Sequence, residues 1–274
     1  MEVNEKQEAN EAEFRLTGHV AVVTGAAKGL GAAITDVLAS EGAHVVLSAR
    51  DVDALRDHAD ELDGKYTHRD SLVVRCDVSR EDDVDDLIGQ SVERFGGIDI
   101  VVNAAGVIGP IETPAHEVTP LEFRDVLEVN LVGTFLVCRA AIPHMIRRGR
   151  GRIVNIAGTS GLRGYRNRVA YSSSKWAVRG LTRTLALELG QYGITVNSIC
   201  PGVTHGRRMN TIIQEKARKL GLDPEDVYLD YTRQTALGRF IEDSDIAAAV
   251  RFLVSEDARN ITGQEIVVDA GWDV

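Results

Sequence analysis

Residues 20–31 read VAVVTGAAKGLG, an apolar run that passes directly into a glycine-rich turn. The run is continuous rather than alternating, which is typical of a strand covered on both faces. Glycines let such a turn bend tightly and approach a pyrophosphate, and the helix that follows offers free N–H groups and a positive dipole end. A glycine turn before a helix is common, but its place in the first strand–helix unit favours a phosphate-binding turn.

The same alternation continues along the chain. Short runs rich in Val and Ile are separated by segments of helical length, with no repeat and no linker. Thr119-Pro120-Leu121-Glu122 combines an N-cap, a first-turn proline and a capping-box glutamate, and Ser79-Arg80-Glu81-Asp82 sets acids against a helix dipole. The alternation predicts a single α/β domain, with a doubly wound Rossmann-type parallel sheet of about seven strands and helices on both faces. The expected strands are His19–Thr24, His44–Ala49, Ser71–Cys76, Ile98–Asn103, Arg152–Ala157, Ile194–Ile199 and Glu265–Asp269.

Composition and charge exclude several classes of protein. The 274 residues include 31 Lys and Arg against 41 Asp and Glu, a formal net charge of −10, which argues against a nucleic-acid or anionic-membrane partner. Cys76, Cys138 and Cys200 are far apart and form no CxxC pair, which is typical of buried thiols in a reducing compartment and predicts no metal site. No stretch approaches about 18 uncharged apolar residues, so we expect no membrane span and a cytoplasmic location.

Two segments depart from the regular alternation. Residues 1–15 are acidic and lack an apolar signal-peptide core, so we expect a mobile tail ahead of a domain over 16–274. At about 205–239 a helical insertion precedes the last helix, in the place where such folds build a substrate lid. Its two helices are expected over Met209–Leu220 and Pro224–Gln234, the second capped by Asp223.

The end of the second strand predicts which dinucleotide binds. NAD sites usually hold an acid there for the ribose 2′-OH, and NADP sites a cation for the 2′-phosphate. The chain reads Ser48-Ala49-Arg50, with Ala49 in the place of the acid, and Lys28 in the glycine turn adds a second charge. Because Arg binds phosphate bidentately, we expect NADP(H) to be favoured over NAD(H). The alternative is that Arg50 is a solvated strand-end charge, and Asp51 beside it weakens the positive field.

Tyr171 and Lys175 lie four residues apart at the start of a helical pattern that runs to Leu189. This spacing puts both side chains on one helix face. A free tyrosine titrates near ~10, and a neighbouring ammonium lowers that pKa enough for general acid/base work. Alone, the pair is a frequent accident of surface helices. Combined with a dinucleotide turn, it indicates a catalytic pair.

Asn130 interrupts an otherwise apolar helix face. It lies on the row Val126, Asn130, Thr134 and Cys138. Asparagine is a poor residue for a helix interior and needs hydrogen-bond partners when it is buried. From the residues alone, a structural asparagine and a member of an active site are equally supported.

Together these motifs resemble the short-chain dehydrogenase/reductase family, in its single-domain subgroup with TGxxxGxG and YxxxK motifs, from about Leu16 to Asp273. The resemblance implies NAD(P)(H)-dependent interconversion of a secondary alcohol and a ketone by hydride transfer. The matching segments are TGAAKGLG (24–31), CDV (76–78), NAAG (103–106), VNLVG (129–133), YSSSK (171–175), PG (201–202) and GQEIVVDAG (263–271).

The resemblance also implies roles for individual residues. Tyr171 would be the general acid/base, Lys175 would bind the nicotinamide ribose and lower the tyrosine pKa, and Asn130 would hold a water that links Lys175 to solvent. A homotetramer or homodimer is implied as well, with the helices of Asn130 and Tyr171 packed against their mates. Besides Tyr171 and Lys175, the cofactor would be held by Gly25, Lys28, Gly29, Leu30, Gly31, Arg50, Asp77, Val78, Asn103, Ala104, Gly106, Pro201, Gly202, Val203 and Thr204.

The chain departs from the family pattern at Gly158. The family places a serine thirteen residues before the tyrosine, where its hydroxyl hydrogen-bonds the reacting carbonyl, and this chain has glycine there. Ser160 or Thr159 is one replacement, with Ser160 the better because two residues keep the same side of an extended chain. A lost donor, which costs ~10² to 10³ in rate, and a water or substrate group in its place are the other interpretations. We expect Gly158 and Ser160 to contact substrate.

The substrate mouth is expected from residues 158–169, 108–112 and the insertion. Local cations there could receive a carboxylate, phosphate or sulfonate, and salt bridges at a subunit contact explain them equally well. Two other functions remain open: a cofactor-binding sensor or scaffold, in line with Gly158, and a nucleotide-sugar epimerase or dehydratase, whose GxxGxxG turn and larger C-terminal domain are absent. The mouth carries Arg163, Arg166, Arg168, Arg207 and Arg208.

Overall fold

Seven strands form one sheet in the order β3-β2-β1-β4-β5-β6-β7, and every neighbouring pair is parallel. This confirms the expected fold class, and the expected strand ends differ from the observed ones by at most two residues. The computed structural model describes residues 15–67 and 69–272, so residues 1–14 of the predicted tail lie outside the described residues. The strands are β1 (Val20–Thr24), β2 (His44–Ala49), β3 (Ser71–Arg75), β4 (Ile100–Asn103), β5 (Gly151–Ile156), β6 (Ile194–Pro201) and β7 (Glu265–Val268).

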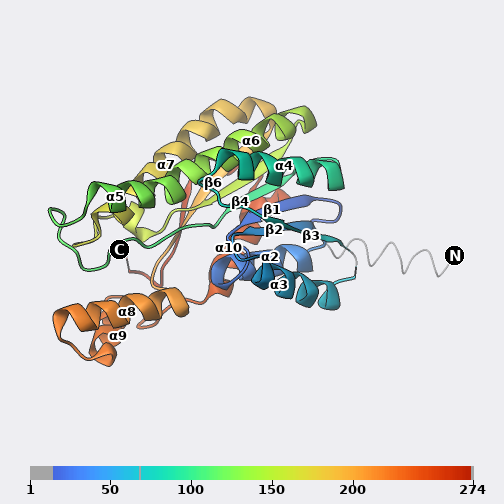
Figure 1. Ribbon diagram of the computed structural model, residues 1–274. Helices are drawn as coiled ribbons and strands as arrows, with labels where there is room; N and C mark the ends of the chain where they lie inside the picture. The colour runs from blue at the N-terminus through green and yellow to red at the C-terminus, as the bar shows by residue number, and fades with distance from the viewer. Residues whose placement is uncertain (1–14, 68, 273–274) are drawn as a thin grey trace.

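Helices cover both faces of this sheet (Figure 1). One layer contains α2 (Gly29–Ser40), α3 (Val52–Lys65) and α10 (Asp243–Val254). The other contains α4 (Glu81–Phe95), α5 (Pro120–Leu127), α6 (Gly133–Arg148) and α7 (Val169–Leu189). The inserted helices α8 (Arg207–Leu220) and α9 (Pro224–Arg233) form a separate lobe at one end of the molecule.

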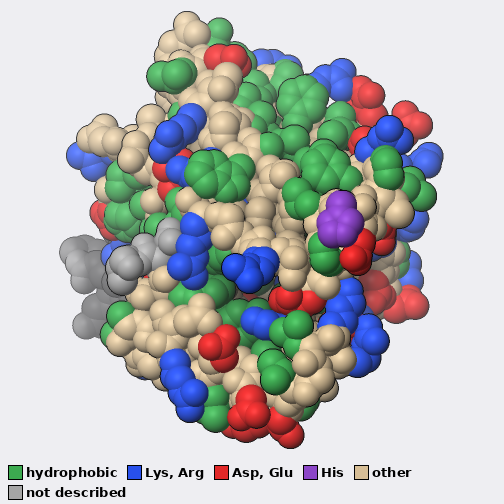
Figure 2. Space-filling view, turned by 90° about the vertical axis from the view of Figure 1, so that its left-hand side faces the viewer, with side chains coloured by type: hydrophobic (Ala, Val, Ile, Leu, Met, Phe, Trp, Pro, Cys, Tyr) green, Lys and Arg blue, Asp and Glu red, His purple; other side chains and the backbone are tan. Residues whose placement is uncertain are grey.

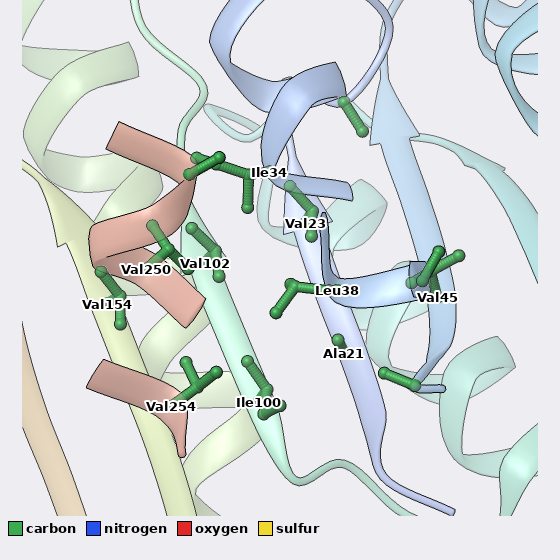
Figure 3. Close-up of a cluster of buried hydrophobic side chains, with 14 of the residues drawn as sticks. Ala21, Val23, Ile34, Leu38, Val45, Ile100, Val102, Val154, Val250 and Val254 are labelled. Carbon is green, nitrogen blue, oxygen red and sulfur yellow. The ribbon is translucent and has the colours of Figure 1, made fainter. Parts of the chain in front are cut away.

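Burial of both faces explains why the strand sequences are continuously apolar. Successive strand residues point to opposite faces. On β1, Ala21 and Val23 belong to the core formed with α2 and α10 (Figure 3), whereas Val20 and Val22 belong to the core formed with α4 and α6. All four are at most 2% exposed. The expectation of a two-sided parallel sheet therefore has a direct packing cause.

The turn between β1 and α2 has the geometry that requires glycine. Gly25 and Gly29 have φ of +71° and +57°, in the left-handed region that side chains disfavour. A Cβ on Gly31 would lie 2.1 Å from the Gly25 carbonyl oxygen, so the helix can start here only without a side chain. The N-cap residue of α2, Lys28, makes no capping hydrogen bond with its side chain, which leaves the first N–H groups of the helix available to a ligand.

Local start signals are realised as expected in two helices. Thr119 Oγ1 accepts from the Glu122 N–H at 3.2 Å, and the Glu122 carboxylate accepts from the Thr119 N–H at 2.9 Å. Asp223 accepts from the Glu225 N–H at 2.8 Å and caps α9. The insertion is therefore helical as predicted, with α8 beginning two residues earlier than expected.

Helices α5 and α6 are joined by a π-helical turn, η1 (Glu128–Val132), into one run from Pro120 to Arg148. This run is long and apolar enough to cross a membrane by length and composition, although Arg139 divides its apolar stretch, so it is not the run of about 18 uncharged residues that the sequence was expected to lack. In the fold it is a core helix whose inner face packs on the sheet beside α4. Its residues Cys138, Ala141 and Met145 are fully buried.

The three cysteines are buried and unpaired, as expected. Burial raises the pKa of Cys138 to about 12 and that of Cys200 to about 11. Because the thiolate is the reactive form, neither side chain is a nucleophile near neutral pH.

Replacing Gly31 with Ala tests the glycine turn. The added Cβ meets the Gly25 carbonyl, so we expect the free energy of unfolding to fall by about 2 kcal/mol. Gly64→Ala is the matched control, because a Cβ there has no neighbour within 4 Å and alanine suits helix α3 better by about 0.5–1 kcal/mol. Urea denaturation measures both variants, and a Gly31→Ala protein as stable as the wild type would contradict this account.

Candidate active site

A cavity of about 1300 Å³ lies at the carboxyl ends of β1, β4, β5 and β6. The strand order reverses between β1 and β4, and open parallel sheets bind ligands at such a switch point. The inserted helices α8 and α9 supply the opposite wall. Figure 2 views this end of the molecule, where Lys and Arg side chains gather around a central hollow.

The cavity brings together predicted site residues from the ends of β1, β4, β5 and β6 and from helices α2 and α7. Gly25 and Gly31 shape the turn behind its wall, and Asn103 and Asn130 are buried beside it. Val78 is buried in the core near α6. The predicted residues that line the cavity are Lys28, Gly29, Leu30, Ala104, Gly106, Gly158, Ser160, Tyr171, Lys175, Pro201, Gly202, Val203 and Thr204.

Helix α7 presents Tyr171 and Lys175 toward the cavity from adjacent turns, as the spacing predicted. The Lys175 ammonium donates to the Ile156 carbonyl at 2.8 Å and lies 5.7 Å from the centre of the Tyr171 ring. Lys175 is only 4% exposed. The end of β5 thus holds a buried cation next to the phenol.

The charges around Tyr171 determine how readily it gives up its proton. Burial raises the pKa of Tyr171, but the positive charges of Lys175, Arg208 and Arg168 outweigh it and hold the pKa below its usual value. Arg208 donates to the Gly106 carbonyl, in the wall of the same cavity. Burial lowers the pKa of Lys175, and the neighbouring Tyr171 opposes this effect. A half-buried phenol of lowered pKa can accept and return a proton in general acid/base catalysis.

The surroundings of Gly158 separate the candidates for the replacement hydroxyl. A Cβ on Gly158 would lie 3.6 Å from Ser160 Oγ and 3.9 Å from Tyr171 Oη. Thr159 Oγ1 is already engaged by Tyr165 Oη at 2.5 Å and by the Pro201 carbonyl at 3.2 Å. Ser160 Oγ is buried and has no hydrogen-bond partner among the described residues. Of the two hydroxyls, Ser160 is the one available to a ligand.

Asn130 fastens the loop that follows β4. Its Oδ1 accepts from the Val107 N–H at 2.8 Å, and its Nδ2 donates to the Val107 carbonyl at 3.1 Å and to Ser174 Oγ at 3.0 Å. The residue lies in the π-helical turn η1, a feature often found at functional sites. These contacts favour the structural interpretation of its side chain, in which it orients the wall of the cavity next to Gly106.

Asn103 holds β4 against its neighbour rather than facing the cavity. Its Nδ2 donates to Asn155 Oδ1 at 2.9 Å and to Cys138 Sγ at 3.3 Å. Its Oδ1 is buried without a partner among residues 15–67 and 69–272. Asn103 thus holds in place the end of β4, and the loop that follows it lines the cavity.

The cations predicted for the 2′-phosphate face acids at the ends of β2 and β3. Lys28 Nζ lies 2.6 Å from Asp51 Oδ2, and Arg50 lies 3.9 Å from Asp77 Oδ2 with its side chain 65% exposed. The hydrogen bonds from Lys28 and from the Ala54 N–H hold the pKa of Asp51 below its usual value. The glycine turn, whose backbone packs so closely on Gly31 that a Cβ has no room, and the open start of α2 make this corner fit a dinucleotide phosphate.

Sequence reasoning missed part of the substrate wall. Lys216 lines the cavity from α8, with its ammonium 4.6 Å from the centre of the Tyr231 ring, and Trp272 packs 5.2 Å from Tyr165. Lys216 follows Arg208 at helical spacing, which could have identified it. Nothing in the local sequence marks Trp272. Within the described part of the chain, no group of three or more His, Cys, Asp or Glu side chains could hold a metal ion.

Comparisons with known proteins agree with this geometry. A family model described as enoyl-(acyl carrier protein) reductase matches residues 25–273. The L-fucose dehydrogenase of Oryctolagus cuniculus is 40% identical over 260 residues, which are 95% of this chain and 87% of that protein.

Solved structures extend the comparison. NAD+-bound xylitol dehydrogenase superposes with a TM-score of 0.90 at 32% identity, covering 94% of this chain and all of that one. A single-substitution variant of the actinorhodin polyketide ketoreductase with NADPH gives 0.88 at 34% identity, covering 94% and 98%. The match spans the turn, the Tyr-Lys helix and the inserted lobe alike. The chain therefore belongs to the short-chain dehydrogenase/reductase family of nicotinamide-dependent enzymes that act on CH–OH groups.

Proposed function

We propose that this protein interconverts a secondary alcohol and a ketone, with Tyr171 as the general acid/base. The observation that carries the proposal is the half-buried Tyr171, which lines the cavity with its pKa lowered by three neighbouring cations. The glycine turn of β1 opens on the same cavity. Proton transfer and cofactor binding therefore have adjoining sites.

The residues of the chain handle the proton. The nicotinamide, when bound, supplies or accepts the hydride. In the oxidation, ionised Tyr171 accepts the proton of the alcohol hydroxyl, and in the reduction the neutral phenol returns it to the carbonyl oxygen. Lys175 stabilises the ionised form through its charge and would also hold the nicotinamide ribose. Asn130 is proposed to position the wall next to Lys175 and to hold a water that leads to solvent.

The cofactor-binding residues divide by their place in the fold. Gly25, Gly29 and Gly31 with the start of α2 would hold the pyrophosphate. Asp77 and Val78 would contact adenine, residues 103–106 would line the nucleotide, and residues 201–204 would flank the nicotinamide amide. We propose NADP(H) over NAD(H), because Ala49 replaces an acid and Arg50 is exposed at the end of β2.

Ser160 is proposed as the donor to the reacting carbonyl. Its unpartnered Oγ lies 3.6 Å from the position that a side chain on Gly158 would take. A preorganised donor of this kind stabilises charge that develops on the substrate oxygen.

The rest of the chain is proposed to act around this site. The domain over 16–274 would use α8 and α9 as a lid over the substrate. Exposed Phe135 (44%) on α6, with Trp176 (48%) and Leu187 (87%) on α7, supports helix pairing in a homodimer or homotetramer. The buried free thiols support a cytoplasmic location.

Tyr171→Phe removes the acid/base while leaving the cavity intact. We expect kcat to fall by at least about 10³, with the dissociation constant of NADP+ unchanged. Tyr192→Phe, at an exposed position, is the control. The assay follows the absorbance of the reduced cofactor over a panel of alcohols. Undiminished activity of the Phe variant would refute the mechanism, and NADP+ binding by a wild type that oxidises no alcohol would favour a cofactor sensor.

Ser160→Ala tests the replacement donor. Loss of this hydroxyl is expected to lower kcat/KM by about 10²–10³. The control is Ser173→Ala, close to Tyr171 on α7, because the Ser173 side chain has no hydrogen-bond partner among the described residues. This variant is expected to keep the wild-type kcat/KM. Gly158→Ser is expected to bring no gain, because its φ of +109° strains any side chain at a cost of about 1–3 kcal/mol. A large rise in turnover for Gly158→Ser would instead show that a donor is missing.

Arg50→Ala tests the cofactor preference. Loss of a charged donor to the 2′-phosphate costs about 1.5–3 kcal/mol, so the ratio of kcat/KM for NADP+ to that for NAD+ should fall about 10- to 100-fold. Arg56→Ala removes an arginine that is 68% exposed on α3 and paired only with Asp53 among the described residues, and the ratio should not move. Equal or better turnover by the wild type with NAD+ would overturn the preference.

A further inference from the structure

The Tyr171 end of the cavity carries an excess of positive charge that the cofactor does not explain. The acids that line the cavity as a whole are Glu112 and Asp243, and Asp243 lies beside Gly29 of the glycine turn. Dinucleotide phosphates would meet the cations near the glycine turn, at the far end of the cavity. The cations that line the substrate end are Arg163, Arg166, Arg168, Arg208 and Lys216.

Arg168 is buried next to the tyrosine, with no acid in contact among the residues that the structure describes. Its guanidinium carbon lies 4.9 Å from the centre of the Tyr171 ring, and one terminal nitrogen donates to the Ile108 carbonyl at 3.0 Å. The residue is 8% exposed, and its buried Nε has no hydrogen-bond partner among the described residues. A buried guanidinium left this way is costly. Such a buried guanidinium is typical of a site to which an anionic ligand binds.

Arg208 reaches the same place from the lid. It lies in the first turn of α8, lines the cavity and donates to the Gly106 carbonyl, and its charge contributes to lowering the pKa of Tyr171. Its neighbour Arg207 acts at the other end of the cavity, where its charge contributes to lowering the pKa of Asp51. Of these two arginines, only Arg208 therefore faces the position of the reacting substrate.

We propose that the substrate is a 2- or 3-hydroxy acid, or its keto form, whose carboxylate or sulfonate is bound by Arg168 and Arg208. The inference rests on the proposed function. The Arg168 guanidinium lies 4.9 Å from the centre of the Tyr171 ring and Arg208 lines the same cavity, so an anion bound by both arginines lies within a few hydrogen-bond lengths of ~3 Å from the carbinol oxygen. That distance fits an acid group one or two carbons from the carbinol. A neutral sugar or cyclic alcohol would leave Arg168 unpaired.

Gly158 contributes space to this arrangement. A Cβ there would lie 3.9 Å from Tyr171 Oη, in the space that an acid group next to the carbinol would occupy. Its absence leaves that volume to the ligand, while Ser160 Oγ remains within reach as the neutral donor. Bidentate guanidinium binding then orients the carbinol toward the phenol.

The experiment compares pairs that share one carbinol. Wild-type protein with its preferred nicotinamide cofactor is assayed on 2-hydroxybutyrate and 3-hydroxybutyrate, each against its methyl ester. We expect kcat/KM to be at least about 100-fold higher for one acid than for its ester. Arg208→Gln should lower the acid-to-ester ratio of kcat/KM by about 10- to 100-fold, mainly through the KM for the acid, whereas the loss of its charge near Tyr171 changes kcat for acid and ester alike. Arg207→Gln should leave the acid-to-ester ratio unchanged.

A binding measurement separates the anion site from catalysis. Butyrate, which carries the acid group without a carbinol, should raise the Tm of the cofactor-loaded wild type but not that of the Arg208→Gln protein, and neutral butyramide should raise neither. Equal kcat/KM for acid and ester, or an equal loss of both in Arg208→Gln, overturns the anion site and leaves alcohol oxidation standing. Butyrate stabilisation without turnover of any alcohol supports the anion site and contradicts the proposed function.

Discussion

The site depends on an ammonium that is buried with no carboxylate bonded to it among the described residues. Lys175 is 4% exposed, and its hydrogen bond goes to a main-chain carbonyl at 2.8 Å. An isolated charge in such surroundings is unfavourable, so a neighbouring group that can become negative, here Tyr171, is stabilised in that form. Arg168 from the preceding loop and Arg208 from α8 add to the same effect. A change in the position of α8 therefore changes both access to the cavity and the proton affinity of Tyr171.

Gly158, where the family resemblance leads one to expect a serine, has an unusual backbone conformation. Gly158 has a φ of +109°, which turns the chain so that Thr159 bonds inward to Tyr165 and Ser160 is left with a free hydroxyl among the described residues. The absence of a side chain at Gly158 also leaves space next to the phenol, on the side of the cavity lined by Arg168 and Arg208. The proposed hydroxyl donor and the proposed anion site therefore both depend on this one residue.

Local patterns in the chain were enough to predict the parallel sheet, the glycine turn, the caps at Thr119 and Asp223, and the shared face of Tyr171 and Lys175. Each of these follows from residues close together in the chain, through strand and helix periodicity or cap chemistry. The family was recognisable on the same grounds. Even the helices of the insertion were predicted within two residues.

Which side chains are free to act depends on packing between distant segments. The choice of Ser160 over Thr159 rests on contacts with Tyr165 and Pro201, which no local pattern contains. In the same way, one arginine at the start of α8 contacts a carbonyl 102 residues away, while the arginine before it acts elsewhere. Periodicity assigns a side chain to a helix face, but it cannot say which distant loop meets that face, because long-range packing places those loops.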